Sequence, residues 1–414
     1  MQIYDLAVIG GGPAGMMAAG RAAELGAKVI LLEKNSSLGA KLLITGGGRC
    51  NITNAQFDVR TFLSKYKDSD KFLFSAFSQF NVKDTIDFFN GRGMPTKVEA
   101  GNRVFPESDK SQSVFDVLTS YVKLGGVEVI IDATVTGFDK KNGQIISVKL
   151  KDGREIHAKK FVLATGGTSR PETGSTGDGF AWLKELGHKV IPSDNALVPV
   201  MISDQWVKDA TGLTLQDIKL TTFQNNQKQE SQKGRLLFTH FGLSGPTILN
   251  MSKDIGELLK YGEVEIRLDL LPSLDHGMMN TRLQELFKID DKKMIKNSLG
   301  SLVPSALVPA ILQLSRIDGE KINNAVTREE RMKLIETIKA LAMQVSGLLG
   351  ADKAIVSSGG VDLTEVDFKT MQSKIIPNLY LVGDILNIDR PSGGYSLQLC
   401  WTTGYVAGSD LLGS

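Results

Sequence analysis

The first residues able to do chemistry form a glycine-rich turn that is followed by an acid. Gly10, Gly12 and Gly15 have the G-x-G-x-x-G spacing. In that pattern the glycines permit a tight turn, close approach of a pyrophosphate and packing of the next helix on the strand. The N-terminus of that helix offers free N–H groups to phosphates. Glu33 stands where a carboxylate binds ribose hydroxyls, and it would repel a 2′-phosphate. The pattern predicts bound FAD or NAD rather than NADP.

A second glycine-rich segment favours FAD. Residues 39–54 read GAKLLITGGGRCNITN, directly after the acidic strand. An extended flavin cofactor needs backbone amides and close approach there, whereas NAD has no such need. Lys41 and Arg49 can neutralise a pyrophosphate or an anionic reduced flavin. Cys50 has no partner at C-x-x-C spacing, so we interpret it as a packed residue and expect no dithiol mechanism.

The C-terminal part of the chain carries the matching half of a flavin site. An apolar run at 379–382 ends in Gly383-Asp384, which is expected to place the Asp384 carboxylate on the ribityl chain of FAD. Residues 391–398 (PSGGYSLQ) open a helix that should run towards Leu412. Its first N–H groups can face the N1–C2=O edge of the flavin. Tyr395 is predicted to contact flavin or substrate, with simple packing as an equal alternative.

The strands and helices predicted around these motifs form an α/β pattern. Apolar runs at 3–9, 28–32 and 160–164 predict buried parallel strands, and residues 16–25 predict a helix between the first two. Short β-like runs fill 127–157, and Val135 there is expected to contact adenine through its backbone. Thr165 and Gly166 follow a strand that returns the chain to the cofactor. The GSTGDG run at 174–179 should open a helix and line the substrate side.

The domain plan follows from where the flavin motifs lie. We predict a discontinuous FAD-binding domain at 1–194 and 351–414. Residues 195–275 show β-like runs and predict an inserted β-barrel-like subdomain, while 276–350 predict a helical subdomain. A helix should begin near Ser244-Gly245-Pro246.

The composition is that of an ordinary globular protein. The 414 residues are 42% hydrophobic and 23% charged, and 48 basic side chains stand against 46 acidic ones. This balance argues against a nucleic-acid partner. The sequence shows no secretory signal, no apolar stretch of about twenty residues and only two cysteines, so we expect a cytoplasmic protein without a membrane partner. Its oligomeric state is left open.

Histidine is the remaining candidate for catalysis or metal binding. The four histidines are dispersed in the sequence and lack ligand spacing, so no metal site is predicted. His240, in FTHFGLSGP, is the best placed of them for an active-site role, and a structural role is the alternative.

The sequence resembles the NAD(P)/FAD-dependent oxidoreductases of the aminoacetone oxidase and BaiN type, over essentially the whole chain. The resemblance rests on GGGPAGMMAA, KLLITGGGRCNITN, FTHFGLSGP, SSGGVDLTEVD and LVGDILNIDRPSGGYSLQLCWTTGYVAG. It implies a glutathione-reductase-like, Rossmann-type FAD domain made from both chain ends, non-covalent FAD and an inserted domain. Asp384 stands where many members carry Glu, and Arg390-Pro391-Ser392 where many read Gly-Pro-Thr.

The predicted function is that of an FAD-dependent oxidoreductase. Hydride would pass between a small organic substrate or NAD(P)H and flavin N5. Because a second NAD(P)-binding motif is missing from the sequence, NAD(P)H would bind only transiently. The alternatives are a dioxygen-using amine oxidase, a flavin-bearing nucleic-acid modifier and a non-catalytic flavin-binding protein. The predicted catalytic residues are Tyr395 and His240. The predicted cofactor-binding residues are Gly10, Gly12, Ala14, Gly15, Glu33, Lys34, Lys41, Gly47, Arg49, Asn51, Val135, Thr165, Gly166, Asp384, Gly394, Ser396 and Leu397.

Overall fold

The computed structural model describes residues 2–192, 195–350, 356–357 and 359–410. The chain divides into two compact units, one made of Met1–Asn195 with Ala354–Ser414 and the other of Ala196–Lys353. Each has a hydrophobic core of its own. No helix in the described part of the chain is long and apolar enough to cross a membrane.

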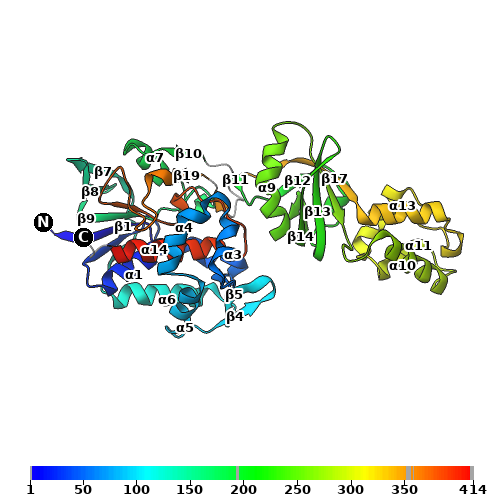
Figure 1. The fold of residues 1–414 in the computed structure, drawn as a ribbon, viewed down its shortest axis with the longest axis horizontal. Coiled ribbons are helices and arrows are strands. Elements are labelled where there is room, and N and C mark those ends of the chain that lie inside the picture. Colours follow the sequence, from blue (N-terminus) through cyan, green and yellow to red (C-terminus); the bar gives the residue numbers. More distant parts are fainter. Residues whose placement is uncertain (1, 193–194, 351–355, 358, 411–414) are drawn as a thin grey trace. The chain divides into compact units, whose positions relative to one another are not determined.

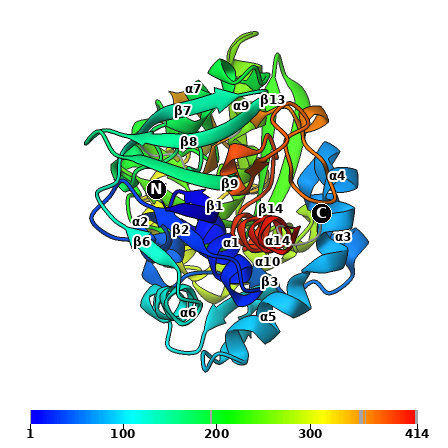
Figure 2. The same cartoon turned by 90° about the vertical axis from the view of Figure 1, so that its left-hand side faces the viewer.

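A seven-stranded sheet forms the centre of the first unit (Figures 1 and 2). Its order is β6 (Glu128–Ile130), β2 (Val29–Leu32), β1 (Ile3–Ile9), β9 (Glu155–Leu163), β8 (Gln144–Leu150) and β7 (Val135–Lys141), and β20 (Leu379–Leu381) also pairs with β9. Strands β6, β2, β1, β9 and β20 run parallel, whereas β8 pairs antiparallel with both β9 and β7. All four residues of β2 are buried, as expected of a strand covered on both faces. The Rossmann-type α/β prediction is confirmed.

Two helices from opposite chain ends lie side by side against this sheet (Figure 2). They are α1 (Pro13–Glu24) and α14 (Tyr395–Ser409). Their close approach requires glycine. A Cβ on Gly404 would lie 2.4 Å from the carbonyl oxygen of Ala14, and one on Gly408 would lie 2.6 Å from that of Ala18. The packing therefore ties the N-terminal glycine turn to the C-terminal flavin motif.

Smaller elements complete the first unit. Its other helices are α2 (Ala40–Leu43), α3 (Val59–Leu63), α4 (Asp70–Gln79), α5 (Val82–Asn90), α6 (Ser111–Leu124) and α7 (Asp178–Glu185). Strands β3 (Thr53–Asn54), β5 (Arg103–Pro106) and β4 (Thr96–Glu99) form a small sheet, and β10 (Val190–Ile191) pairs with β19 (Gly360–Val361). The last of the β-like runs within 127–157 and most of the apolar run at 160–164 belong to one continuous strand, β9 (Glu155–Leu163).

The second unit contains a closed barrel and a group of helices. The barrel order is β12 (Val200–Ile202), β15 (Gly242–Ser244), β14 (Gln227–Thr239), β13 (Thr214–Gln224), β16 (Glu265–Asp269) and β17 (Leu341–Leu348). The helices are α8 (Gln205–Asp209), α9 (Pro246–Leu259), α10 (His276–Ile289), α11 (Ile295–Ser298), α12 (Val308–Ser315) and α13 (Arg328–Lys339). Helix α9 begins with Pro246 in its first turn, as expected.

One boundary inside this unit differs from the expectation. Residues 341–348, assigned above to the helical part, form β17 and close the barrel by pairing with β12 and β16. The physical reason is their alternating burial, in which Leu341, Met343 and Val345 face the core. Barrel and helices share one hydrophobic core.

Candidate functional site

A cleft of the first unit lies at the sheet edge where the parallel strands end. Gly10 follows β1, Glu33 follows β2, Ala164 follows β9 and Val382 follows β20, and all four residues line the cleft. Open α/β sheets bind ligands at this carboxyl edge. The topology thus brings together motifs from both ends of the chain.

All but five of the predicted cofactor residues line this cleft. They are Gly10, Gly12, Ala14, Glu33, Lys34, Lys41, Val135, Thr165, Gly166, Asp384, Ser396 and Leu397. The structure therefore brings them together, while their contact with a cofactor stays a prediction.

The three glycines of the first turn have three different environments. Gly10 has a φ of +106°, and a Cβ there would lie 2.5 Å from the carbonyl oxygen of Ala164. On Gly15 a Cβ would lie 1.9 Å from the carbonyl oxygen of Gly10, so this residue is a packing glycine and does not line the cleft. A Cβ on Gly12 would meet no atom within 4 Å. That space lies where a pyrophosphate must approach the backbone.

Glu33 is buried, and both of its carboxylate oxygens accept backbone hydrogen bonds. Oε2 accepts from the N–H of Gly11 at 2.8 Å, and Oε1 accepts from the N–H of Asn35 at 2.8 Å. Each oxygen can accept a further bond. The carboxylate is thus held in one orientation and still able to bind a hydroxyl group.

A polar wall beside Glu33 pairs the predicted residue Lys34 with the 174–178 segment, and the sequence did not reveal this pairing. Lys34 Nζ donates to Thr176 Oγ1 at 2.5 Å and to Asp178 Oδ2 at 2.8 Å. Asn35 Nδ2 donates to the carbonyl oxygen of Thr173 at 3.1 Å. The segment 174–178, expected on the substrate side, therefore lies at the Glu33 end of the cleft. The opposite charges of Lys34 and Asp178 are a signal, but no local pattern pairs residues so far apart in sequence.

The other end of the cleft is charged. Lys41 Nζ donates to Ser169 Oγ at 2.5 Å and lies 3.8 Å from Asp384 Oδ2. Burial lowers the pKa of Lys41. Cys400 also lines the cleft, which the sequence did not reveal, and burial raises the pKa of its thiol to about 12. A thiol with so raised a pKa is a poor nucleophile near neutral pH.

The first turn of α14 faces the cleft through Ser396 and Leu397. Its N-cap, Gly394, has a φ of +102° and supplies no side-chain cap, so the first N–H groups of the helix are free to bind a ligand. A Cβ on Gly394 would lie 2.3 Å from the carbonyl carbon of Thr53, which explains the glycine by packing. Gly394 itself does not line the cleft.

Three predicted residues of the 39–54 segment also lie outside the cleft. Arg49 stacks over the Phe105 ring and forms ion pairs with Glu99 and Asp109, so its charge is neutralised within the protein. Gly47 lies exposed in a turn with a φ of +67°. Asn51 is different, because its Oδ1 is buried and accepts no hydrogen bond in the described part of the chain.

The cleft fits a dinucleotide on the evidence of its own polar groups. Thr165 Oγ1, in the cleft lining, is buried without a hydrogen-bond partner among the described residues. Unsatisfied buried polar atoms are uncommon in native proteins and call for an explanation. The unsatisfied Thr165 hydroxyl, the open space at Gly12 and the oriented Glu33 carboxylate together match the polar groups of FAD.

The two predicted catalytic residues belong to different units. Tyr395 packs on Phe62 and Tyr66 with ring centroids 4.8 and 6.0 Å apart, and burial raises the pKa of its phenol. It does not line the cleft. His240 lies exposed in the turn between β14 and β15 of the second unit. Their catalytic roles stay predictions.

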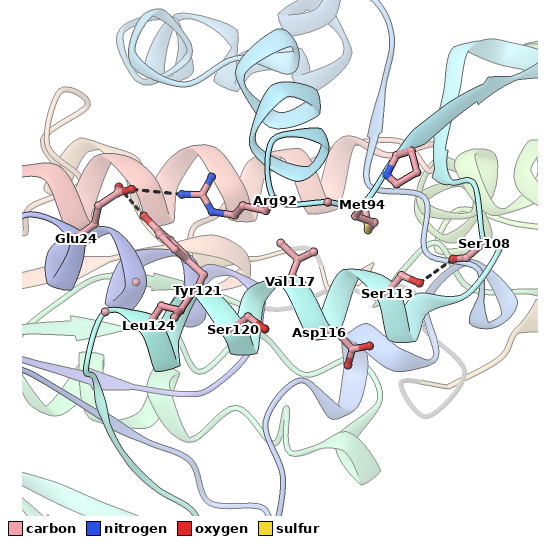
Figure 3. A pocket seen from close by; sticks show the side chains of 14 residues that line it. Glu24, Arg92, Met94, Ser108, Ser113, Asp116, Val117, Ser120, Tyr121 and Leu124 are labelled. Atoms are coloured by element: carbon pink, nitrogen blue, oxygen red, sulfur yellow. Dashed lines mark hydrogen bonds and ion pairs between the residues drawn. The ribbon is translucent and has the colours of Figure 1, made fainter.

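The first unit has a second cavity, of about 760 Å³, alongside α6 (Figure 3). There Glu24 accepts hydrogen bonds from Arg92 at 3.3 Å and from Tyr121 at 2.8 Å. None of the predicted cofactor residues lines this cavity. The Glu24 carboxylate in this cavity therefore already has hydrogen-bond partners within the protein.

Comparison with known proteins places the whole chain in one family. A family model described as the HI0933-like protein Rossmann domain matches residues 4–410. The chain is 30% identical over 407 residues to the 3-dehydro-bile acid delta(4,6)-reductase of Clostridium scindens, covering 97% of this chain and 98% of that protein. It is 29% identical over 413 residues to the ribosomal RNA dihydrouridine synthase of Escherichia coli, covering 100% and 99%.

A solved structure supports the same fold. The 3-ketosteroid delta1-dehydrogenase from Sterolibacterium denitrificans superposes with a TM-score of 0.56 at 13% identity, over 99% of each chain. At this identity the likeness concerns the fold alone. The family match covers nearly every residue and agrees with the flavin motifs predicted from the sequence. The chain is therefore a member of the HI0933-like family of FAD-dependent oxidoreductases.

Proposed function

We propose that this protein is a reductase that saturates a carbon–carbon double bond conjugated to a carbonyl group. The observation that carries the proposal is its full-length similarity to two enzymes whose names describe such a reduction. A 3-oxo steroid with a Δ4 double bond is a conjugated enone, and dihydrouridine is uridine whose ring double bond, conjugated to a carbonyl, is reduced. Two substrate scaffolds thus share one chemistry.

The residues of the cleft have defined parts in this proposal. The turn at Gly10 and Gly12 would hold the pyrophosphate, Glu33 the ribose and Asp384 the ribityl chain. Bound FAD would supply the hydride chemistry. Lys41, close to Asp384, would favour negative charge on the cofactor.

The two thiols support direct reduction rather than a thiol relay. Cys50 and Cys400 are buried and unpaired, and burial raises the pKa of each to about 12. A thiol relay needs a thiolate near neutral pH. The donor that reduces the flavin, NADH or NADPH, remains part of the proposal.

The substrate scaffold is open between a steroid-like enone and a uracil ring. The expectation of no nucleic-acid partner stays a prediction, because a relative over the whole chain is named a ribosomal RNA dihydrouridine synthase. The near-neutral charge of the chain favours a small-molecule substrate over ribosomal RNA.

The test is anaerobic reoxidation of the reduced holoenzyme. NADH and NADPH are each tried as reductant, and the reduced enzyme is mixed with a 3-oxo-Δ4 steroid, with unmodified ribosomal RNA or with buffer. We expect one acceptor to restore the oxidised flavin spectrum and to gain two hydrogen atoms by mass spectrometry. The saturated 3-oxo steroid is the matched control and should leave the flavin reduced. Reduction of the oxidised enzyme by amines, with no reoxidation by either acceptor, would establish an amine oxidase instead.

A further inference from the structure

Arg390 is a buried cation that binds two residues of the cleft lining but does not itself line the cleft. Its side chain is 1% exposed, yet it is absent from the residues that line the cleft. Nε donates to Ser396 Oγ at 3.1 Å, Nη1 donates to the carbonyl oxygen of Ile388 at 2.7 Å, and Nη2 donates to Asp384 Oδ1. Its two side-chain acceptors, Asp384 and Ser396, both line the cleft.

These three bonds connect separate segments of the chain. Asp384 lies in the turn that follows β20, Ile388 in the next loop, and Ser396 in the first turn of α14. The guanidinium group is a rigid planar fork with fixed donor directions. Arg390 therefore sets the distance between the Asp384 carboxylate and the start of α14, two parts of one cleft wall.

The cationic side chains around Asp384 outnumber its single negative charge. Arg390 pairs with Oδ1, while Lys41 Nζ lies 3.8 Å from Oδ2, so two cationic side chains flank one carboxylate. Removing an arginine and an aspartate from water is costly, and such a buried pair is weak evidence of a contribution to stability. A role in organising the cleft accounts for the cost.

We propose that Arg390 is a positioning residue for the flavin cofactor, which acts through Asp384 and Ser396 and adds positive charge that favours the reduced state. The inference rests on FAD being the cofactor and is independent of the substrate. No group in the cleft needs to contact Arg390 itself, since its side chain is enclosed by protein.

The test compares Arg390→Gln with Arg21→Gln in the full-length protein. Arg21 holds the other end of α14, because its Nε donates to Ser409 Oγ at 2.9 Å, and it does not line the cleft. Both variants loosen one end of α14, but only Arg390→Gln should affect FAD. We expect its FAD affinity, measured by fluorescence titration, to fall at least about tenfold, because Asp384 loses the charged hydrogen bond that orients it towards the cofactor. Its flavin midpoint potential, measured against a reference dye, should also fall.

Two further variants separate position from charge and from folding. Arg390→Lys keeps the charge but loses the fork, so the potential should stay near that of the unmodified protein while FAD affinity drops. Asp384→Asn should raise the potential, because it removes a negative charge. Combined with Arg390→Gln it should give a loss of FAD affinity smaller than the sum of the single losses, since one variant removes the group through which the other acts.

The inference is overturned if Arg390→Gln binds FAD with unchanged affinity and potential, or if Arg21→Gln causes the same losses. Additive losses in the pair with Asp384 would also overturn it. Failure of every enone and uracil acceptor in the unmodified holoenzyme would overturn the proposed function alone, because these readouts require only bound FAD.

Discussion

At the scale of single residues, two glutamates near the first helix show how placement decides function. Glu33 lies in the cleft with its oxygens held by two backbone N–H groups, whereas Glu24 is bound by Arg21, Arg92 and Tyr121 in the other cavity. We predict that Glu33→Ala weakens FAD binding by about 1–3 kcal/mol, the cost of losing charged hydrogen bonds. Fluorescence titration with FAD measures this loss. Glu24→Ala is the control and should leave FAD affinity unchanged, and equal losses in both variants would remove Glu33 from the site.

At the scale of elements, the β1–α1 turn separates a packing glycine from a ligand-facing one. A methyl group on Gly15 would collide with the Gly10 carbonyl, whereas a methyl group on Gly12 would point into open space. The φ of Gly12 is −76°, a value that alanine also adopts. We predict that Gly15→Ala lowers the free energy of unfolding by about 1–3 kcal/mol, the usual cost of overpacking. Gly12→Ala should keep the stability of the apoprotein but weaken FAD binding.

Denaturant unfolding of the apoproteins and FAD titration provide the two measurements. A Gly12→Ala protein that binds FAD as tightly as the parent would show that the cofactor does not approach α1 at this turn. A fully stable Gly15→Ala apoprotein would contradict the packing role.

At the scale of the whole molecule, the cleft that we propose for the cofactor belongs to one unit. Every residue that lines it lies within Met1–Asn195 or Ala354–Ser414, and this unit has its own core. Strands β11 (Asn195–Ala196) and β18 (Val356–Ser357) pair. We predict that replacing residues 197–353 by a short Gly/Ser linker leaves FAD affinity within about threefold of the parent, as expected when few contacts are changed.

The same deletion should abolish reduction of the substrate, if the second unit contributes to the substrate site. Retained turnover would confine the substrate site to the first unit. Loss of FAD binding with a folded first unit, judged by circular dichroism, would contradict the independence of the cleft.

The parts of this protein that depend on local pattern could be predicted from its residues alone. Contiguous apolar runs identified the parallel strands, and the G-x-G-x-x-G turn, Glu33 and Gly383-Asp384 identified the cofactor motifs. These signals are readable because strand periodicity, turn geometry and helix starts are set by neighbours in sequence. Helix α9 was predicted for the same reason, from Pro246 at its first turn.

The pairing of distant charges and strands could be seen only in the folded chain. Arg49, next to the glycine loop, is bound by Glu99 and Asp109 instead of facing the cleft, while Lys41 lies beside Asp384. Residues 341–348 became a barrel strand through partners at β12 and β16. Such pairings depend on which surfaces the folded chain brings within reach, and hydrogen bonds and ion pairs carry no preference for sequence separation. The Arg390 fork is a local case of the same kind: its partners Asp384 and Ser396 are close in sequence, but they lie in a short turn after β20 and a first helical turn, whose geometry no helix or strand period predicts.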